Sequence, residues 1–201
     1  MRQPSTLRKM GLIVAVDSKF GIGKNGTIPW TLKKDMSSFV KHTSTTEDPE
    51  KVGVKRVLII YFVSINAVIM GRKCWESIPE KFRPLKNRLN VVISRTLPSH
   101  REENLIISDD FDGIVKELMC GDLSKRVEKV WNIGGAEIYK LALDNELVDQ
   151  LVITKIQEDF DADVFLSGID WNHFQEDESA RSDVMMENGI NFSFSSYRYV
   201  E

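Results

Sequence analysis

The sequence predicts one domain of the α/β class. Short apolar runs rich in β-branched residues, typical of buried strands, alternate with segments whose apolar residues have helical spacing. The length of 201 residues, of which 42% are apolar and 28% charged, is enough for one domain with a sizeable core. Because no repeat or linker interrupts the pattern, we expect a single domain over residues 10–201, preceded by a disordered polar extension over residues 1–9.

The charge balance excludes bulk attraction to nucleic acid or to a membrane surface. The 27 basic and 30 acidic residues leave a net charge of -3. The longest apolar stretch, residues 57–70, is interrupted by Ser64 and Asn66 and is shorter than the about 20 residues that a membrane helix needs. Two cysteines form no disulfide framework and suggest a reducing compartment. We expect a monomer with small-molecule ligands and no specific nucleic-acid or membrane partner. It is expected in the cytoplasm, with a mitochondrial or nuclear pool as the open alternative.

A glycine-rich loop follows the first predicted strand, residues 12–16. Residues 21–26, Gly-Ile-Gly-Lys-Asn-Gly, match the spacing of the dinucleotide-binding fingerprint. That fingerprint needs a helix at its third glycine, whereas Pro29 follows here and no helical period begins before Asp35. The lysine is followed by Asn rather than Ser or Thr, which disfavours a phosphate-binding P-loop.

A helix is predicted from Asp35 to Val40, and the Thr/Ser-rich acidic residues 42–49 are predicted to form a loop. Asp35 lies near the helix N-terminus, where the macrodipole favours a carboxylate. A flexible surface loop rarely needs both a Trp and an acid at the start of a helix. Trp30 and Asp35 therefore indicate a functional site.

Residues 67–70 are predicted to form a buried strand that runs into Gly71 and a short helix. Arg72 and Lys73 beside that helix N-terminus suit an anion, although a solvated basic turn is the commoner outcome for such a pair. Further strands are predicted over residues 90–94 and 105–107. Ser108 is the expected N-cap of the helix that follows.

The predicted strand over residues 130–133 leads directly into Gly134 and Gly135, and a helix follows. Paired glycines at this place bring bare amides toward a phosphate or a ring, or else form only a tight turn. A strand over residues 151–156 carries Thr154, and the alternating residues 192–200 predict an antiparallel strand.

Asp159, Asp161 and Asp163 alternate like ligands of a calcium loop. The sixth position of that loop would be Val164 rather than Gly, and the twelfth Asp170 rather than Glu. We therefore expect no metal site.

In order, these segments resemble the dihydrofolate reductase family over nearly the whole chain from about Met10. Each motif alone is weakly specific, but their succession is highly specific. They are Val-Ala-Val, Gly-Ile-Gly-Lys-Asn-Gly, Ile-Pro-Trp, an acid near the next helix start, Met-Gly-Arg-Lys, Ser-Ile-Pro-Glu-Lys, Arg-Pro-Leu-Lys-x-Arg, Val-Ile-Ser-Arg, Ile-Gly-Gly and Thr154. The resemblance implies a mixed eight-stranded sheet, mostly parallel with an antiparallel C-terminal edge, flanked by helices.

The resemblance also implies the reaction: NADPH-dependent reduction of 7,8-dihydrofolate to tetrahydrofolate, by hydride transfer to pterin C6 and protonation of N5. It implies a role in one-carbon metabolism and in thymidylate and purine synthesis, and binding of antifolates such as methotrexate. Asp35 matches the pocket carboxylate of the family. Burial in an apolar pocket raises the pKa of such a carboxyl, which suits an acid near neutral pH.

The remaining site residues follow from the same resemblance. Trp30 would order a water, Thr154 would hydrogen-bond Asp35, and Arg88 would bind the substrate's α-carboxylate as a fork-to-carboxylate pair. The backbone carbonyls of Ile13 and Ile133 would face the pterin. The implied catalytic residues are Ile28, Trp30, Asp35 and Thr154, and the substrate-binding residues are Ile13, Ala15, Met36, Phe39, Ile78, Leu85, Arg88, Ile133 and Tyr139.

On the cofactor side, the glycine pair would lie under the NADPH pyrophosphate. Arg72, Lys73 and Arg95 would meet the 2′-phosphate, because several cations near one phosphate favour NADPH over NADH. Residues 21–29 would form a mobile loop that closes over the nicotinamide. The implied cofactor-binding residues are Ala15, Ile22, Gly26, Gly71, Arg72, Lys73, Cys74, Ser94, Arg95, Gly134, Gly135, Ala136 and Glu137.

The sequence departs from the family at several positions. Cys74 replaces a usual Thr and so offers a weak thiol in place of a hydroxyl contact to the cofactor phosphates. Met36 stands where many members carry Phe, which alters the wall of the para-aminobenzoyl site. Asn132 is polar where an apolar residue is usual, and it needs a buried partner.

An apolar insertion near residues 54–64 is a larger departure, because family members have a much shorter loop there. Exposed apolar surface of this kind marks a docking patch or an aggregation hazard. Either the segment docks on another surface, or it is untranslated sequence, such as a retained intron, carried into the protein sequence. Detection of a peptide covering residues 58–63 by mass spectrometry of the native protein would exclude the second explanation.

Two other functions compete with the leading one. The related reductase domain of riboflavin synthesis shares the fold but is not expected to combine Ile-Pro-Trp with Asp35 and Arg88. A non-catalytic NADPH- or RNA-binding module would have no use for a buried acid.

Overall fold

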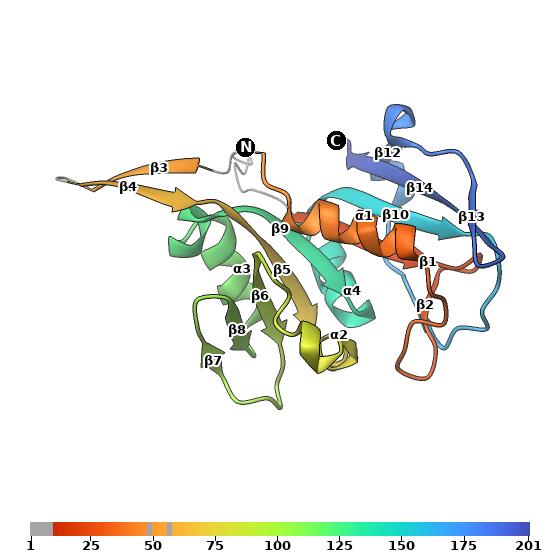
Figure 1. Ribbon diagram of the computed structural model, residues 1–201, viewed down its shortest axis with the longest axis horizontal. Coiled ribbons are helices and arrows are strands. Elements are labelled where there is room, and N and C mark those ends of the chain that lie inside the picture. The colour runs from red at the N-terminus through yellow and green to blue at the C-terminus, as the bar shows by residue number, and fades with distance from the viewer. Residues whose placement is uncertain (1–9, 48–49, 56–57) are drawn as a thin grey trace.

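A ten-stranded mixed sheet forms the centre of the protein, for which a computed structural model describes residues 10–47, 50–55 and 58–201. The strand order is β12-β14-β10-β1-β9-β5-β6-β8-β7, with β13 paired to β14 (Figure 1). The strands are β1 (Met10–Val16), β5 (Ile65–Gly71), β6 (Arg88–Ile93), β7 (His100–Arg101), β8 (Leu105–Ser108), β9 (Val127–Gly134), β10 (Val148–Ile156), β12 (Phe174–Glu176), β13 (Met185–Glu187) and β14 (Ile190–Tyr199).

The pairing confirms the predicted fold class. From β10 to β8 every neighbouring pair is parallel, whereas β14 runs antiparallel to β10 at the C-terminal edge. The sheet has ten strands rather than the expected eight because short strands such as β7, β12 and β13 join its margins as antiparallel partners.

Helices cover both faces of the sheet, as the alternation of side chains along the strands requires. Leu12 and Val14 of β1 pack in one core cluster with residues of α3 and α4, whereas Ile13 packs on the other face with Phe39 of α1 and Cys74 of α2. The helices are α1 (Lys33–Ser44), α2 (Arg72–Ser77), α3 (Phe111–Met119), α4 (Ala136–Asp144) and the 3₁₀ helices η1 (Glu80–Phe82), η2 (Asp122–Lys125), η3 (Trp171–His173) and η4 (Glu178–Ala180).

Two local predictions are wrong. Residues 42–44, predicted as loop, belong to α1, because Thr43 and Ser44 donate hydrogen bonds back to the carbonyls of Phe39 and Val40 within the helix. The N-cap of α3 is Asp110, whose carboxylate accepts from Gly113 N at 2.8 Å; the expected cap, Ser108, instead accepts from Asp110 N.

Two small ribbons lie outside the main sheet. β2 (Gly21–Gly23) pairs antiparallel with β11 (Val164–Phe165). The apolar insertion folds into a hairpin of β3 (Glu50–Lys55) and β4 (Leu58–Val63), which extends away from the sheet (Figure 1). Residues 58–63, in the first half of the apolar stretch over residues 57–70, thus pair with β3. Residues 1–9, the predicted disordered extension, lie outside the described residues.

None of the helices in the described ranges has the length and apolar character that a membrane crossing requires.

Candidate functional site

The predicted site residues gather where the parallel strands end. β1, β9, β5 and β6 are neighbours in the sheet, and the loops that leave their carboxyl ends meet at one edge. Met70 of β5 pairs with Gly134 of β9, and Gly71 pairs with Ile93 of β6, which brings the predicted phosphate-binding segments side by side. Ligands of open α/β sheets bind at this edge.

Asp35 lies in the first turn of α1 and faces the sheet. The Thr154 hydroxyl, on β10, donates a hydrogen bond of 2.6 Å to Asp35 Oδ1, the bond that the resemblance implied. Burial raises the pKa of the Asp35 carboxyl, as predicted; the hydrogen bond from Thr154 opposes this shift, and the negative charge of Glu187 adds to it. The site therefore holds a carboxyl that takes up a proton more readily than a solvated one.

Trp30 lies close to this acid in sequence and is 6% exposed. Its ring meets Phe160 edge-on, with centroids 5.3 Å apart. The indole Nε1 is buried, and no hydrogen-bond acceptor among the described residues reaches it. Since buried donors are normally paired, this N–H is available to a ligand or a bound water.

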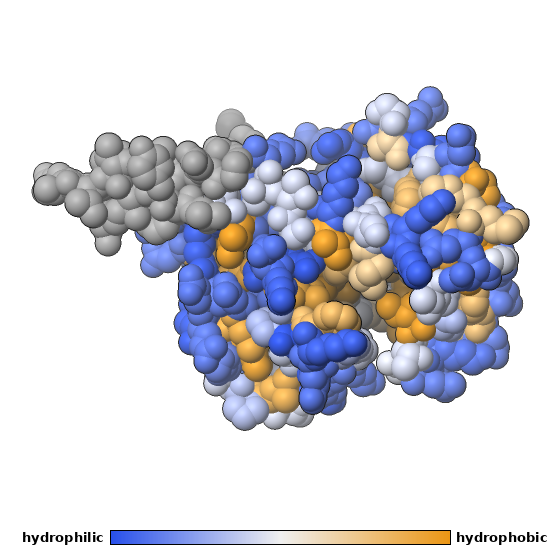
Figure 2. All heavy atoms as spheres, viewed as in Figure 1, coloured by the Kyte–Doolittle hydropathy of each residue, from blue (hydrophilic) through white to orange (hydrophobic). Residues whose placement is uncertain are grey.

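The predicted pterin walls form one apolar cluster on the α1 side of the sheet. Ile13 and Ile133 are buried there, and Phe39, Ile78 and Leu85 pack against them. Ile28 and Met36, also predicted at the site, are 60% and 55% exposed. Figure 2 shows apolar surface along a hollow on this face, between the regions of α2 and β2. Exposed apolar surface beside a polar group is typical of a binding site.

Arg88 is 6% exposed, and neighbouring groups hold its guanidinium in place. Nη1 donates to the Thr43 hydroxyl at 2.6 Å, and Nε donates to the Lys86 carbonyl at 3.0 Å. The guanidinium also lies 5.9 Å from the centroid of the Phe39 ring. Burial lowers the pKa of Arg88, but an arginine side chain remains a cation in proteins. The structure thus places a fixed positive charge at the wall of the apolar cluster.

The β9–α4 turn packs tightly under Tyr139. The Tyr139 hydroxyl donates to the Ile13 carbonyl at 2.8 Å, so this carbonyl, predicted to face the pterin, already accepts one hydrogen bond. Gly134 has φ +95°, and a Cβ there would lie 2.7 Å from the Tyr139 ring, which restricts the position to glycine. Asn132 has the buried partners that it was expected to need: it donates to the Ile138 carbonyl and accepts from Gly134 N.

The N-terminus of α4 offers bare amides. Gly135 is the N-cap and supplies no side-chain hydrogen bond, and a Cβ at Gly135 would meet no atom of the described residues within 4 Å. Helix N-terminal amides beside open space suit a phosphate. Ala136 is partly buried and Glu137 exposed at this helix start.

One of the three predicted phosphate-binding cations forms an ion pair with a carboxylate of the protein. Arg72 pairs with Glu76 along α2 at 2.8 Å, whereas Lys73 and Arg95 are exposed. The Ser94 hydroxyl accepts from the amides of Thr96 and Leu97 and so closes a turn.

Cys74 points inward rather than toward a phosphate. Its thiol lies 3.5 Å from the Ile133 carbonyl, and burial raises the pKa of the thiol to about 11. The side chain is therefore a neutral thiol at physiological pH, and it contacts the sheet at Ile133.

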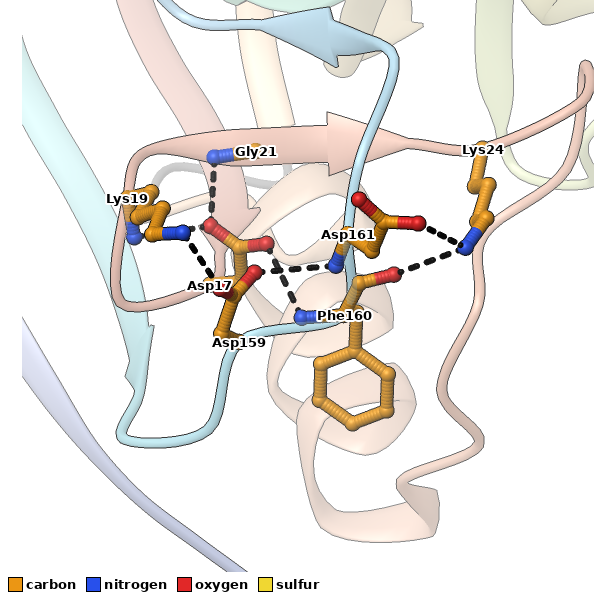
Figure 3. A network of polar contacts seen from close by, with 7 residues as sticks. All are labelled: Asp17, Lys19, Gly21, Lys24, Asp159, Phe160 and Asp161. Carbon is orange, nitrogen blue, oxygen red and sulfur yellow. Dashed lines mark hydrogen bonds and ion pairs between the residues drawn. The ribbon is translucent and has the colours of Figure 1, made fainter.

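A polar network ties the glycine-rich loop to the segment after β10 (Figure 3). Asp17, 3% exposed, accepts from the amides of Gly21 at 2.7 Å and Phe160 at 3.3 Å. Lys19 pairs with Asp159, and Lys24 pairs with Asp161. Two predicted cofactor residues lie on the same loop. Ile22 packs against the core, and Gly26 has φ +74°, with no atom of the described part of the chain within 4 Å of its Cβ position.

Sequence reasoning missed the roles of Asp17 and Glu187. Asp159, Asp161 and Asp163, considered and rejected as calcium ligands, hold the glycine-rich loop instead: Asp163 accepts from Asn25 N at 2.8 Å. The alternating acids and the lysines of the loop were visible in the sequence, but their pairing depends on a contact between segments more than 130 residues apart.

Comparison with known proteins agrees with this geometry. A family model described as dihydrofolate reductase matches residues 63–199. A Caenorhabditis elegans protein is 42% identical over 200 residues, covering 97% of this chain and 99% of its own length. The dihydrofolate reductase of Gallus gallus is 35% identical, covering 96% and 97% of the two chains. The solved dihydrofolate reductase of Schistosoma mansoni superposes with a TM-score of 0.78 at 33% identity, covering 96% and 98%. The chain therefore belongs to the dihydrofolate reductase family of oxidoreductases.

Proposed function

We propose that this protein reduces 7,8-dihydrofolate to 5,6,7,8-tetrahydrofolate with NADPH as the reductant. The observation that carries the proposal is the half-buried Asp35 carboxyl, hydrogen-bonded to Thr154 beside an apolar wall and a fixed arginine. In this reaction the pterin gains a hydride at C6 and a proton at N5. The protein must therefore position two flat rings, exclude water and supply a proton.

Asp35 acts on the proton. Its Oδ1 accepts from Thr154, which leaves Oδ2 to bind the 2-amino and N3 groups of the pterin. The raised pKa keeps a larger fraction of this carboxyl protonated near neutral pH, which favours protonation at N5 through water or through the pterin tautomer. Trp30 Nε1, which has no acceptor among the described residues, orients that water.

Arg88 and the apolar cluster orient the substrate. A folate carries a carboxylate at the end remote from the pterin, and the Arg88 guanidinium binds it as a charge-assisted pair. Phe39, Ile78 and Leu85, packed on Ile13 and Ile133, cover the rings between these two polar ends. The same wall accommodates antifolates with a flat heterocycle.

The cofactor residues fit a nicotinamide dinucleotide. When bound, NADPH supplies the hydride. The Ala136 and Glu137 amides at the start of α4 receive the pyrophosphate beside Gly135, where no described residue lies within 4 Å of the Cβ position. Lys73 and Arg95 attract the 2′-phosphate, and residues 21–29 close over the nicotinamide.

The decisive experiment follows NADPH oxidation at its absorbance band with dihydrofolate as substrate. Methotrexate should abolish the reaction, and Asp35→Asn should cut turnover at neutral pH by orders of magnitude while NADPH still binds. Asp112→Asn, an exposed acid of α3 on the far face of the sheet, is the matched control and should leave turnover unchanged. Unchanged turnover in Asp35→Asn would remove this residue from the mechanism.

We also propose that the protein acts as a cytoplasmic monomer. Cys74 and Cys120 are both free thiols, in keeping with a reducing compartment. Sedimentation of the purified protein near its chain mass of 23.0 kDa would support the monomer.

A further inference from the structure

The helix that carries Asp35 has its N-terminus capped by a residue from the other end of the chain. The N-cap residue of α1 is Leu32, whose side chain cannot cap the free amides. Glu187 takes this role: Oε1 accepts from Lys33 N at 2.7 Å, and Oε2 accepts from Lys34 N at 3.1 Å. One carboxylate thus binds both amides that directly precede Asp35.

Glu187 is itself held in place by the turn that joins β13 to β14. It pairs with Ile190 across this hairpin, and Asn188 in the turn donates to the Thr31 carbonyl at 2.9 Å. Asn188 and Gly189 both have positive φ, at 54° and 78°, as a tight two-residue hairpin turn requires. The hairpin therefore forms hydrogen bonds with the chain on both sides of Leu32, the N-cap of α1.

The same strand supports the other partner of Asp35. β14 pairs with β10, where Phe194 lies opposite Thr154. Two residues on strands that pair with β14 therefore hold Asp35. Thr154 of β10 binds its carboxyl, and Glu187 of β13 binds the backbone amides of its helical turn. Both contacts therefore fix the position of the carboxyl relative to the sheet.

We propose that Glu187 is a positioning residue for dihydrofolate reduction, which fixes the first turn of α1 and hence the orientation of the Asp35 carboxyl, and whose negative charge acts on that carboxyl from outside the pocket. This inference rests on the proposed function, because it assumes that Asp35 is the acid of the site. Glu187 touches neither substrate nor cofactor in this scheme and acts through Asp35.

The charges around the two acids set the direction of the effect. Glu187 faces the amides and the cationic side chains of Lys33 and Lys34, which lower its own pKa. Asp35 faces Thr154, and its negative charge adds to the effect of burial in raising the pKa of the buried Tyr139 of α4. Because the charge of Glu187 raises the pKa of Asp35, removal of this charge should lower the pKa of Asp35. Removal also leaves the positive end of the helix dipole uncompensated, and this positive end favours the Asp35 carboxylate and so lowers its pKa further.

The test compares Glu187→Gln with Glu187→Asp and with the control Glu178→Gln, which removes an equal charge from an exposed position of η4. Glu187→Gln should lower kcat at pH 8 about twofold to fivefold, the size expected of a screened interaction, with little change at pH 6. The alkaline limb of the profile should move to lower pH, and the difference should shrink at about 1 M salt. Glu187→Asp, which keeps the charge, should restore the profile, and Glu178→Gln should match the wild type.

A second readout separates this inference from the proposed function. In ¹³C-labelled protein, the titration of the Asp35 carboxyl by NMR should shift to lower pH in Glu187→Gln, whatever the activity. A profile and a titration that equal those of the wild type, with only a lower Tm, would reduce Glu187 to a structural cap and overturn the inference. A shifted titration with Asp35→Asn fully active would keep the coupling between the two acids and overturn the proposed function instead.

Discussion

The Thr154 hydroxyl and Asp35 Oδ1 lie 2.6 Å apart, so a hydrogen bond joins the central sheet to the first turn of helix α1 at the candidate site. Thr154 is 5% exposed and lies in register with Ala15 of β1. The contact orients the carboxyl and lowers its pKa, against the opposite effect of burial.

Thr154→Val should raise the pKa of Asp35 further, because it removes the hydrogen bond that favours the charged form. The alkaline limb of kcat should move to higher pH, and the KM for dihydrofolate should rise about tenfold as the carboxyl loses its orientation. Steady-state kinetics from pH 5 to pH 9 measure both quantities. Thr154→Ser keeps the hydroxyl and should behave like the wild type; equal profiles for Val and Ser would show that the bond has no role.

Asp35→Asn should make the protein more stable at pH 7. Since the pKa of Asp35 is raised in the folded chain, the folded chain binds more protons than the unfolded chain above the ordinary value of 3.8. The free energy of unfolding therefore falls as pH rises from that value through the folded pKa, and the loss is complete above it. Urea unfolding should show a gain for the variant at pH 7 that disappears near pH 3.8. A less stable variant at pH 7 would contradict this.

Asp17→Ala should loosen the glycine-rich loop. The buried carboxylate accepts from the Gly21 and Phe160 amides, and its loss should destabilise the fold by about 1–3 kcal/mol. Hydrogen exchange of the amides over residues 19–26 should accelerate. Asp161→Ala removes only an exposed ion pair with Lys24, so it should change stability little and accelerate the exchange much less; equal exchange in both variants would rule out Asp17 as the main anchor of the loop.

The glycine pair should separate folding from cofactor binding. Gly134→Ala should destabilise the fold by about 1–3 kcal/mol, because its Cβ would overlap the Tyr139 ring at a positive φ. Gly135→Ala adds a Cβ into open space and should fold normally, yet weaken NADPH binding about tenfold, as measured by fluorescence titration. Wild-type affinity in Gly135→Ala would move the pyrophosphate site away from this turn.

Arg88→Leu should raise the KM for dihydrofolate roughly 10- to 100-fold with a small change in kcat, the pattern of lost uniform binding by a charged hydrogen bond. Thr43→Val, which frees Nη1 from its buried partner, should have a smaller effect in the same direction. A pterin substrate that lacks the terminal carboxylate is the control. If Arg88→Leu slows this substrate equally, Arg88 does not bind the carboxylate.

Much of the fold could be predicted because its strands are local apolar runs bounded by glycines, as residues 130–135 show. The spacing of apolar residues predicts the helix that contains Asp35, but not its end at Ser44. The hydroxyls of Thr43 and Ser44 donate to carbonyls four residues earlier, and these bonds can form only once the helix exists. The site residues were predicted by resemblance, and the structure brings Asp35, Thr154, Trp30 and Arg88 to the α1 side of the sheet.

The class of fold and the order of the elements could be predicted because hydrophobic period and glycine placement are local properties of the chain, and the succession of motifs predicts Asp35 as the acid of the candidate site. The distant residues that contact this acid and the glycine-rich loop become known from the folded chain alone. Glu187 caps α1 across more than 150 positions, and Asp161 and Asp163 hold the glycine-rich loop. Such pairings follow from which strands become neighbours in the sheet, and hydrogen bonds between distant residues have no periodic signal in the sequence.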